Sequence, residues 1–304
     1  MANLKTLPNP PAPRGLLTGK TALITAAAGT GIGFSAAKRF LQEGADVFIS
    51  DIHEGRLAKA VDALEAETGK RPGSGLCNVT VQEEVDALFV QAADHFGPVT
   101  VLVNNAGISS FSDFQDLAKR ELVNLMDINL LSPMLFTHEF LKRLSPSKST
   151  NTNKVKATIV NVGSAFGSIG YPGFSAYCAS KFGLYGFTES LSRELADSNI
   201  RVAYFAPRAT HTNINSDIVD EMNRSLGNAS DSPEFVAKEF MTLIRSNKAR
   251  KFVGWPEKFF ARFNGVFPEI VDRAISTKLN KIKRFLNKSR TSESVSEISL
   301  VEEK

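Results

Sequence analysis

Hydrophobic residues occur along the chain in short continuous runs that alternate with longer stretches of helical periodicity. Such runs, bounded by glycine or polar residues, are typical of strands buried on both faces of a parallel sheet. They occupy residues 20–26, 46–50, 99–103, 157–162, 200–206 and 251–254, and a further strand ends near Leu76. Because strands that alternate with helices build a parallel sheet covered on both sides, we predict an α/β fold with a doubly wound parallel sheet of about seven strands.

The pattern changes after residue 254. Aromatic and aliphatic residues then recur at helical spacing with lysine and arginine between them, so the sequence predicts two amphipathic helices hinged near Pro268. We therefore divide the chain into four parts, which are a flexible, proline-rich N-terminal arm (1–16), an α/β domain (17–254), a basic amphipathic helical extension (255–290) and a disordered acidic tail (291–304).

Positive charge is concentrated in the extension. The formal net charge is +4, yet thirteen of the 36 lysines and arginines lie between Arg245 and Arg290, with only three acidic residues among them. A basic amphipathic pair of helices can lie on an anionic membrane surface, cover a cleft in the body or pack against a second subunit, and the sequence leaves these alternatives open. Its aromatic residues follow the apolar stripe and are not interleaved for base stacking, which argues against a nucleic-acid partner.

Composition also bears on the compartment and on metal binding. The two cysteines, Cys77 and Cys178, and the four histidines show no metal-ligand spacing, so we expect no metal site and a reducing environment. The N-terminal stretch lacks the apolar core of a signal peptide, and no run is long enough to span a bilayer. We expect a cytoplasmic protein, with attachment at a membrane surface as the alternative.

One segment carries a constellation suited to proton transfer. Tyr177 and Lys181 are one helical turn apart, so both side chains project from one face of a helix. A cation at that distance favours the phenolate, which predicts that Lys181 lowers the pKa of Tyr177 toward the range useful for general acid–base catalysis. Ser164 lies at the end of the apolar run 157–162, which predicts a buried strand. The ends of such strands are where parallel sheets place their chemistry.

A glycine-containing loop, 27–33, joins the first strand to a helical pattern. Glycines there let the backbone approach a pyrophosphate, whose charge is received by the N-terminus of the helix. Asp51 stands at the end of the second strand, eighteen residues after Gly33. A carboxylate at that point accepts hydrogen bonds from a ribose diol and repels a 2′-phosphate, so NAD is favoured over NADP.

Taken together, Ser164, the segment YCASK (177–181), the glycine loop and the segment NNAG (104–107) resemble the signature of the short-chain dehydrogenase/reductase family from about Leu17 to Gly254. The resemblance implies a Rossmann-like fold and reversible hydride transfer between NAD, or alternatively NADP, and a secondary alcohol or ketone.

The resemblance also implies roles for individual residues. Tyr177 would donate a proton to the carbonyl oxygen, Ser164 would hydrogen-bond that oxygen, and Lys181 would lower the pKa of Tyr177 while holding the ribose. Asn129 would anchor a water linked to the lysine. Cofactor contacts are expected from Thr25, Gly29, Thr30, Gly31, Ile32, Asp51, Asn78, Val79, Asn105, Ala106, Gly107, Tyr177, Lys181 and Thr210.

The sequence departs from the family pattern in three places. The glycine loop lacks the family's first glycine, whose place falls on Ala26 or Ala27 depending on the alignment. Asn78 stands where relatives usually have an aspartate. Arg208 replaces a glycine after the sixth strand, and either Thr210 or Thr212 follows as the candidate nicotinamide contact.

These features predict an oxidoreductase. The phenylalanine-rich extension suggests a lipophilic substrate of acyl-chain, steroid or terpenoid type. Residues 213–229 are expected to form a lid over the substrate. The alternative is a catalytically idle dinucleotide-binding redox sensor that docks to a membrane or partner through its tail. The resemblance further implies a homodimer or tetramer, because relatives often pair through the helices that follow the fourth and fifth strands.

Overall fold

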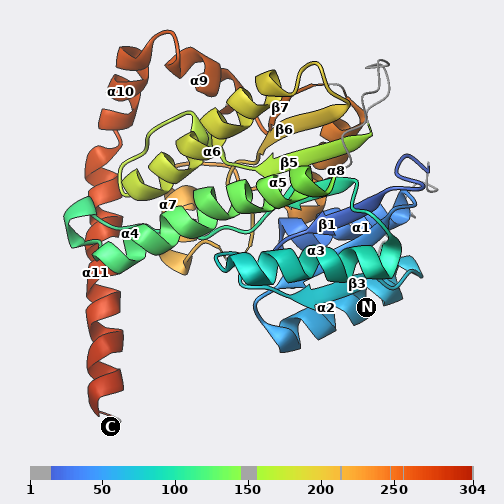
Figure 1. Cartoon of the computed structure of the whole chain (residues 1–304). Helices are drawn as coiled ribbons and strands as arrows, with labels where there is room; N and C mark the ends of the chain where they lie inside the picture. The colour runs from blue at the N-terminus through green and yellow to red at the C-terminus, as the bar shows by residue number, and fades with distance from the viewer. Residues whose placement is uncertain (1–14, 145–155, 213, 247, 256, 303–304) are drawn as a thin grey trace, which may run out of the picture.

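Seven strands form one fully parallel sheet in the order β3-β2-β1-β4-β5-β6-β7, which confirms the predicted fold class (Figure 1). The computed structural model describes residues 15–144, 156–212, 214–246, 248–255 and 257–302, so the predicted N-terminal arm lies almost wholly outside the described residues. The strands are β1 (Thr21–Ile24), β2 (Asp46–Asp51), β3 (Gly73–Leu76), β4 (Val101–Asn104), β5 (Ala157–Val162), β6 (Ile200–Ala206) and β7 (Arg250–Phe252).

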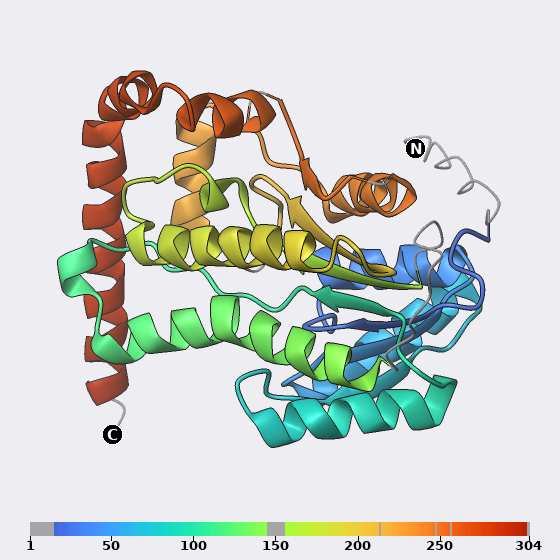
Figure 2. The same cartoon turned by 45° about the horizontal axis from the view of Figure 1, so that its top comes forward.

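Helices cover both faces of this sheet (Figure 2). They are α1 (Ile32–Gln42), α2 (Glu54–Thr68), α3 (Gln82–Phe96), α4 (Lys119–Met126), α5 (Ser132–Arg143), α6 (Ser175–Glu194), α7 (Asp217–Ser225) and α8 (Pro233–Arg245), with short turns η1 (Phe114–Asp116), η2 (Asp127–Leu131) and η3 (Ala165–Gly167). One hydrophobic core joins the sheet to α1, α2 and α8, and a second joins it to α3, α5 and α6.

Strand β1 shows why both cores form. Successive side chains of a strand point to opposite faces of the sheet. Ala22 and Ile24 therefore belong to the first core and Leu23 to the second, and all three are fully buried. An uninterrupted apolar run is what a strand covered on both faces requires.

The strand order reverses between β1 and β4, because the chain leaves β1 toward β2 on one side and returns to β4 on the other. Ligands bind in the crevice that such a reversal leaves beyond the carboxyl ends of the strands. Buried amides join the next pair of strands, β4 and β5. Asn104 Nδ2 donates to Asn161 Oδ1 (2.8 Å), and Asn161 Nδ2 donates to Thr188 Oγ1 on α6 (2.9 Å). Asn104, the first residue of the NNAG segment, therefore anchors the central sheet.

The extension contains three helices where the sequence predicts two: α9 (Glu257–Asn264), α10 (Pro268–Ser276) and α11 (Leu279–Glu302). Pro268 begins α10, where the missing N–H of proline costs no helical hydrogen bond. The break between α10 and α11 contains no glycine or proline, so the sequence pattern did not indicate it. Helix α11 continues to Glu302 and so includes residues 291–302, for which the sequence predicts a disordered acidic tail. Residues 291–302 contain no glycine or proline to end the helix.

Helices α10 and α11 pack against the α/β body. Val271, Ile282 and Leu286 are buried, and the last two lie in a cluster with Phe174 and Met222. Ion pairs add to this contact, since Lys288 pairs with Glu221 (2.5 Å). Arg290 pairs with both Asp113 and Asp116. In Figures 1 and 2 α11 runs down one side of the molecule, and Lys288 and Arg290 of this helix pair with acidic groups of the body.

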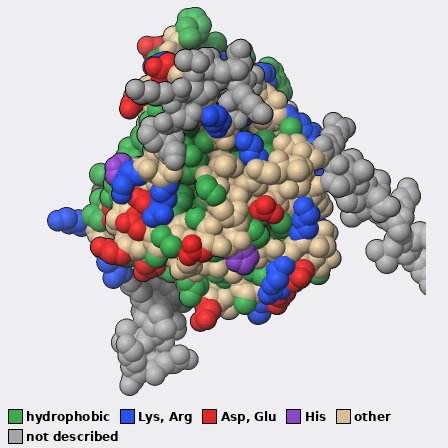
Figure 3. Space-filling view, turned by 45° about the vertical axis from the view of Figure 1, so that its right-hand side comes forward, with side chains coloured by type: hydrophobic (Ala, Val, Ile, Leu, Met, Phe, Trp, Pro, Cys, Tyr) green, Lys and Arg blue, Asp and Glu red, His purple; other side chains and the backbone are tan. Residues whose placement is uncertain are grey.

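No described helix is sufficiently long and apolar to cross a lipid bilayer. On the face drawn in Figure 3, the described basic and acidic side chains lie beside one another and form no continuous patch of one sign.

Candidate functional site

The carboxyl ends of the central strands open into one cavity of about 680 Å³. The glycine loop and Asp51 line one end of the cavity, Ser164, Tyr177 and Lys181 line its middle, and aromatic and aliphatic side chains line the other end. The sequence-predicted residues on its wall are Gly29, Thr30, Gly31, Ile32, Asp51, Asn105, Gly107, Ser164, Tyr177, Lys181 and Thr210.

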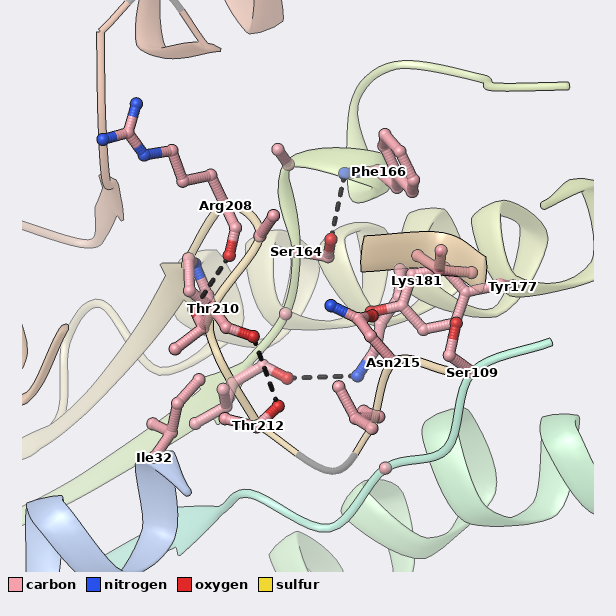
Figure 4. Close-up of a pocket in the computed structure, with 18 of the residues that line it drawn as sticks. Ile32, Ser109, Ser164, Phe166, Tyr177, Lys181, Arg208, Thr210, Thr212 and Asn215 are labelled. Carbon is pink, nitrogen blue, oxygen red and sulfur yellow. Dashed lines mark hydrogen bonds between the residues drawn. The ribbon is translucent and has the colours of Figure 1, made fainter. Parts of the chain in front are cut away.

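Ser164 follows β5 and begins the short turn η3. Its Oγ accepts a hydrogen bond from the Phe166 N–H (3.1 Å; Figure 4), which leaves the hydroxyl proton free to donate. The buried Tyr204 hydroxyl of β6 lies 3.2 Å from both the N–H and the carbonyl oxygen of Ser164. Tyr204 thus positions the serine backbone.

Sequence reasoning missed Tyr204. The available signal is a pair of glycines, because a Cβ on Gly163 or Gly167 would lie 2.0 Å or 2.2 Å from the Tyr204 hydroxyl. Glycines spaced in this way around the candidate serine indicate a bulky neighbour.

Tyr177 and Lys181 both project from α6 toward the cavity (Figure 4). Lys181 is 3% exposed, and its Nζ donates to the Val162 carbonyl (3.2 Å). Burial lowers the pKa of Lys181 from 10.5 to about 8, because the cation is removed from water.

The pKa of Tyr177 moves opposite to the expectation from sequence. Burial raises it from 10.0 to about 12, only partly opposed by the Ser164 hydroxyl, which favours the phenolate. The Lys181 Nζ lies 5.8 Å from the centre of the Tyr177 ring and contributes no resolved lowering of the pKa. The phenol is therefore protonated at neutral pH, as a proton donor must be.

Asn129 is fully buried in η2, a π-helical segment between α4 and α5. Its amide exchanges two hydrogen bonds with the backbone of Ile108 (2.9 Å each), and its Nδ2 also donates to Ser180 Oγ (3.0 Å). It lies behind the cavity wall. A Cβ built on Gly107 would be 3.2 Å from Asn129 Oδ1 and 3.4 Å from Lys181 Nζ, so both polar groups lie close to Gly107.

Conformation identifies the residue that replaces the family's first glycine. Ala26 has φ +52°, the left-handed region that glycine adopts readily and other residues adopt at a cost. Of the two alignments, the structure therefore supports the one that pairs Thr25 and Ala26 with the family's threonine and glycine, with one extra residue before Gly31.

The loop that follows fits a dinucleotide. Gly31 caps α1 without a side-chain hydrogen bond, so the N–H groups of the first helical turn remain available beside the cavity. A Cβ on Gly33 would meet Asn105 at 2.5 Å, which accounts for the glycine at that position. At the far side, Asp51 accepts from the N–H groups of Ala28 (3.3 Å) and His53 (3.1 Å), and its Oδ1 lies 4.0 Å from Arg56 Nη2.

Four predicted cofactor residues do not line the cavity, namely Thr25, Asn78, Val79 and Ala106. Thr25 Oγ1 accepts hydrogen bonds from the N–H groups of Asn105 and Ala106 (3.0 Å each), so it connects β1 to β4. Asn78 Oδ1 accepts from the N–H and hydroxyl of Thr80 and shapes the turn before α3.

Arg208 does not place an unpaired cation in the cavity. Its guanidinium forms a two-point ion pair with Asp231 (2.9 and 2.8 Å), a partner that the sequence did not reveal. In Figure 4 the side chain points away from Tyr177 and Lys181. Thr210 and Thr212 both line the cavity, and Thr210 Oγ1 donates to the Arg208 carbonyl (3.0 Å).

Comparison with known proteins agrees with this arrangement. The family model for short chain dehydrogenase matches residues 20–223. The chain belongs to the short-chain dehydrogenase/reductase family. As a member of it, the protein is an oxidoreductase that acts on CH–OH or carbonyl groups with an NAD(P) cofactor.

Individual short-chain dehydrogenase/reductase relatives differ in their named substrates. A hydroxy-methyl-oxo-hexahydroindene-carboxyl-CoA reductase of Mycobacterium tuberculosis is 36% identical over 205 residues, covering 67% of this chain and 76% of the relative. A 3-oxoacyl-(acyl-carrier-protein) reductase of Haemophilus influenzae is 31% identical over 230 residues, covering 73% and 90%. The structure of an actinorhodin polyketide ketoreductase variant with NADPH has a TM-score of 0.67 at 29% identity, covering 77% and 94%.

The conformation of Ala26 predicts that Ala26→Gly stabilises the protein. Removing the Cβ relieves left-handed strain of ~1 kcal/mol, part of which is offset by the larger entropy of the unfolded glycine chain. Urea unfolding should show a net gain below that value. Ala27→Gly serves as the control, because Ala27 is fully buried and has no positive φ, and it should lower stability. Equal losses in both variants would contradict this account.

The buried cation predicts that Lys181→Met raises the free energy of unfolding at pH 7 while abolishing activity. The pKa of Lys181 is lower in the folded protein than in the unfolded chain, so the folded protein holds this proton less tightly. Burial of the cation therefore destabilises the wild type by its full amount below about pH 8. The destabilisation decreases as the pH rises toward 10.5. We expect a gain of ~2 kcal/mol after loss of the Val162 hydrogen bond.

Urea unfolding at pH 7 and pH 10 measures the effect, and the gain should shrink at the higher pH. Lys59→Met, on the exposed side of α2, is the control and should change little. A gain independent of pH would refute the electrostatic origin.

Proposed function

We propose that the protein interconverts a lipophilic secondary alcohol and the corresponding ketone by hydride transfer to and from a nicotinamide cofactor. The observation that carries the proposal is the continuity of the cavity. The wall that holds Ser164, Tyr177 and Lys181 continues into an apolar end lined by Phe166, Phe174 and the extension. A carbonyl group beside Tyr177 would thus have its apolar substituents in the aromatic part of the same cavity.

The nicotinamide cofactor supplies the hydride when bound. Among the residues that line the cavity, those proposed to hold it are the N-terminal turn of α1 for the pyrophosphate, Asp51 for the adenosine ribose, and Thr210 or Thr212 for the carboxamide. Asn105 and Gly107 form the wall between these positions.

Three side chains handle the substrate oxygen and its proton. In reduction, the Tyr177 hydroxyl donates its proton to the carbonyl oxygen while the Ser164 hydroxyl donates a hydrogen bond to the same oxygen. Lys181 holds a positive charge close to the phenol. This charge stabilises the negative charge that develops on the phenol oxygen as the proton leaves. Asn129 fixes the wall beside Lys181 and is proposed to hold a water that connects the lysine to solvent.

The substrate class follows from the lining and from the extension. Phe260, Val271 and Ile275 of α9 and α10 form part of the apolar end, next to Phe166 and Phe174 of the body. The named substrates of the relatives, a 3-oxoacyl chain and an oxo-hexahydroindene, are both carbonyl compounds with apolar bodies. We therefore propose an acyl-chain or polycyclic ketone, of steroid or terpenoid type. Among the described residues, no feature favours the alternative of a catalytically idle redox sensor.

The proposal includes a cytoplasmic location and a homo-oligomer. One part of the extension is left for an outside partner: Trp255 is 72% exposed and Phe259 46% exposed, at the start of α9. Exposed aromatic residues gathered at the start of a helix and just before it mark a contact surface. A second subunit and a membrane surface are the two partners proposed for it.

Replacing the phenol tests the chemistry. Tyr177→Phe should lower kcat for ketone reduction by about 10²–10⁴-fold, because the proton donor is lost while the apolar ring remains. NADH binding, measured by fluorescence, should stay close to that of the wild type. Turnover at the wild-type rate would overturn the assignment of Tyr177.

Asp51 tests the cofactor preference. The wild type should use NADH with a higher kcat/KM than NADPH, and Asp51→Ser should reduce this ratio by ~10-fold or more, because it removes both the acceptor for the ribose diol and the charge that repels a 2′-phosphate. Arg56 then remains to attract that phosphate. Asp46→Ser, at the exposed start of β2, is the control. A wild type that prefers NADPH would refute the preference for NAD.

A further inference from the structure

Helix α9 carries a row of aromatic rings that begins just before the helix and ends just after it. Its members lie four residues apart along the chain and are Trp255, Phe259, Phe263 and Phe267. Successive ring centres are 5.8, 5.3 and 5.2 Å apart, so each ring packs on the next. Trp255, Phe259 and Phe267 are exposed, and α9 lies at the upper edge of the molecule in Figure 1. The rings therefore form one continuous apolar row on the surface.

Two cations flank this aromatic row. Lys258 and Arg262 are also one helical turn apart, and each directly precedes a ring of the row, so they lie beside it on α9. Both are exposed, and among the described residues neither forms an ion pair or a side-chain hydrogen bond. Glu257, the one acidic residue of α9, begins the helix. The row thus has an unpaired positive edge, in contrast with Lys288 and Arg290 of α11, which pair with the body.

The other flank of α9 joins the row to the cavity. Phe260 lines the apolar end of the cavity, and its ring centre is 5.8 Å from that of Phe259. One turn further along, Asn264 Nδ2 donates to the Ser168 carbonyl (2.9 Å) and holds the helix on the body. The row is therefore fixed in place before any partner binds, which lowers the entropic cost of binding.

The size of this surface favours a lipid partner over a second subunit. In the described part of the extension, the exposed large apolar residues are Trp255, Phe259, Phe260, Val266, Phe267 and Ile270. A stable subunit interface uses about 20–30 residues on each side. An amphipathic helix, by contrast, binds a membrane surface through a few apolar side chains and the cations beside them, and tryptophan is favoured at the level of the lipid headgroups.

We propose that the aromatic row of α9, together with Lys258 and Arg262, binds the surface of an anionic lipid bilayer. The exposed rings insert below the headgroups, and the two cations contact lipid phosphate groups. Because Phe260 joins the row to the cavity, this orientation places the apolar end of the cavity next to the lipid, from which a lipophilic ketone can enter. The inference rests on the proposed function for this route, whereas lipid binding itself requires no activity.

Co-sedimentation of the full-length protein with vesicles tests the binding. The wild type should bind vesicles of mixed phosphatidylcholine and phosphatidylglycerol more tightly than vesicles of phosphatidylcholine alone. The double variant Trp255→Ser, Phe259→Ser should bind the anionic vesicles ~10²-fold more weakly, because it removes two inserting rings. Phe235→Ser on α8 is the matched control, since Phe235 is 43% exposed and Phe259 46%, and it should bind as the wild type does.

The cations are tested by the double variant Lys258→Gln, Arg262→Gln. Its binding to the anionic vesicles should be about 30-fold weaker, about fivefold for each charge, with binding to phosphatidylcholine alone unchanged. Equal losses on both kinds of vesicle would contradict the assigned role of the two charges.

A wild type that fails to sediment with either kind of vesicle would overturn the inference. So would a control variant that loses as much binding as the aromatic double variant. Light scattering tests the other partner: an oligomer that dissociates in Trp255→Ser, Phe259→Ser, without vesicle binding by the wild type, would assign the row to a second subunit.

Activity on a ketone dissolved in water is measured separately with NADH. Trp255 and Phe259 are not on the cavity wall, so their double variant should keep the wild-type kcat/KM. A wild type that binds vesicles but reduces no ketone would count against the proposed function and would leave the membrane contact supported.

Discussion

The site depends on the hydrogen bonds that join β1 and β4 where the sheet ends. Asn105 Nδ2 donates to the carbonyl oxygens of Thr25 and Ala26 (3.0 Å each), and Thr25 Oγ1 accepts from two N–H groups after β4. These strands diverge at the reversal of strand order, so their loops can no longer pair as a sheet. The side-chain bonds replace that pairing, and they hold the glycine loop and the wall behind the nicotinamide position at a fixed separation.

A second set of buried polar contacts holds the catalytic wall. Lys181 bonds to the last carbonyl of β5, Tyr204 of β6 bonds to the backbone of Ser164, and Asn129 bonds to Ile108 after β4. Each contact ties a functional side chain to the end of a strand. The arrangement has a thermodynamic cost, because the cation of Lys181 is removed from water and the Val162 carbonyl is its one hydrogen-bond partner among the described residues. Packing of the helices on the rest of the sheet must offset that cost.

The two halves of the cavity have different origins. The cofactor half is built from loops after β1, β2 and β4, within the residues matched by the family model. The substrate half includes α9 and α10, which lie beyond that match, and it is completed by α7 and the loop after it. The catalytic residues proposed for this chain lie within the family match, whereas the part of the proposed substrate lining that comes from α9 and α10 lies beyond it. That part of the lining can therefore differ between members that share the chemistry.

The sequence by itself determined the sheet, the order of its elements and the residues around Ser164, Tyr177 and Lys181. Burial on both faces demands continuous apolar strands, and one helical turn sets the separation of the tyrosine and lysine. It also showed that the glycine loop lacks a glycine.

Only the tertiary structure decided what depends on distant parts of the chain. It gave Ala26 the left-handed conformation, paired Arg208 with Asp231, placed Tyr204 against Ser164 and folded the extension over the cavity. It also reversed the expected direction of the pKa shift of Tyr177. The spacing along a helix indicates the nearby lysine but not the removal of the phenol from water. Burial is a property of the whole packed molecule, and no local pattern contains it.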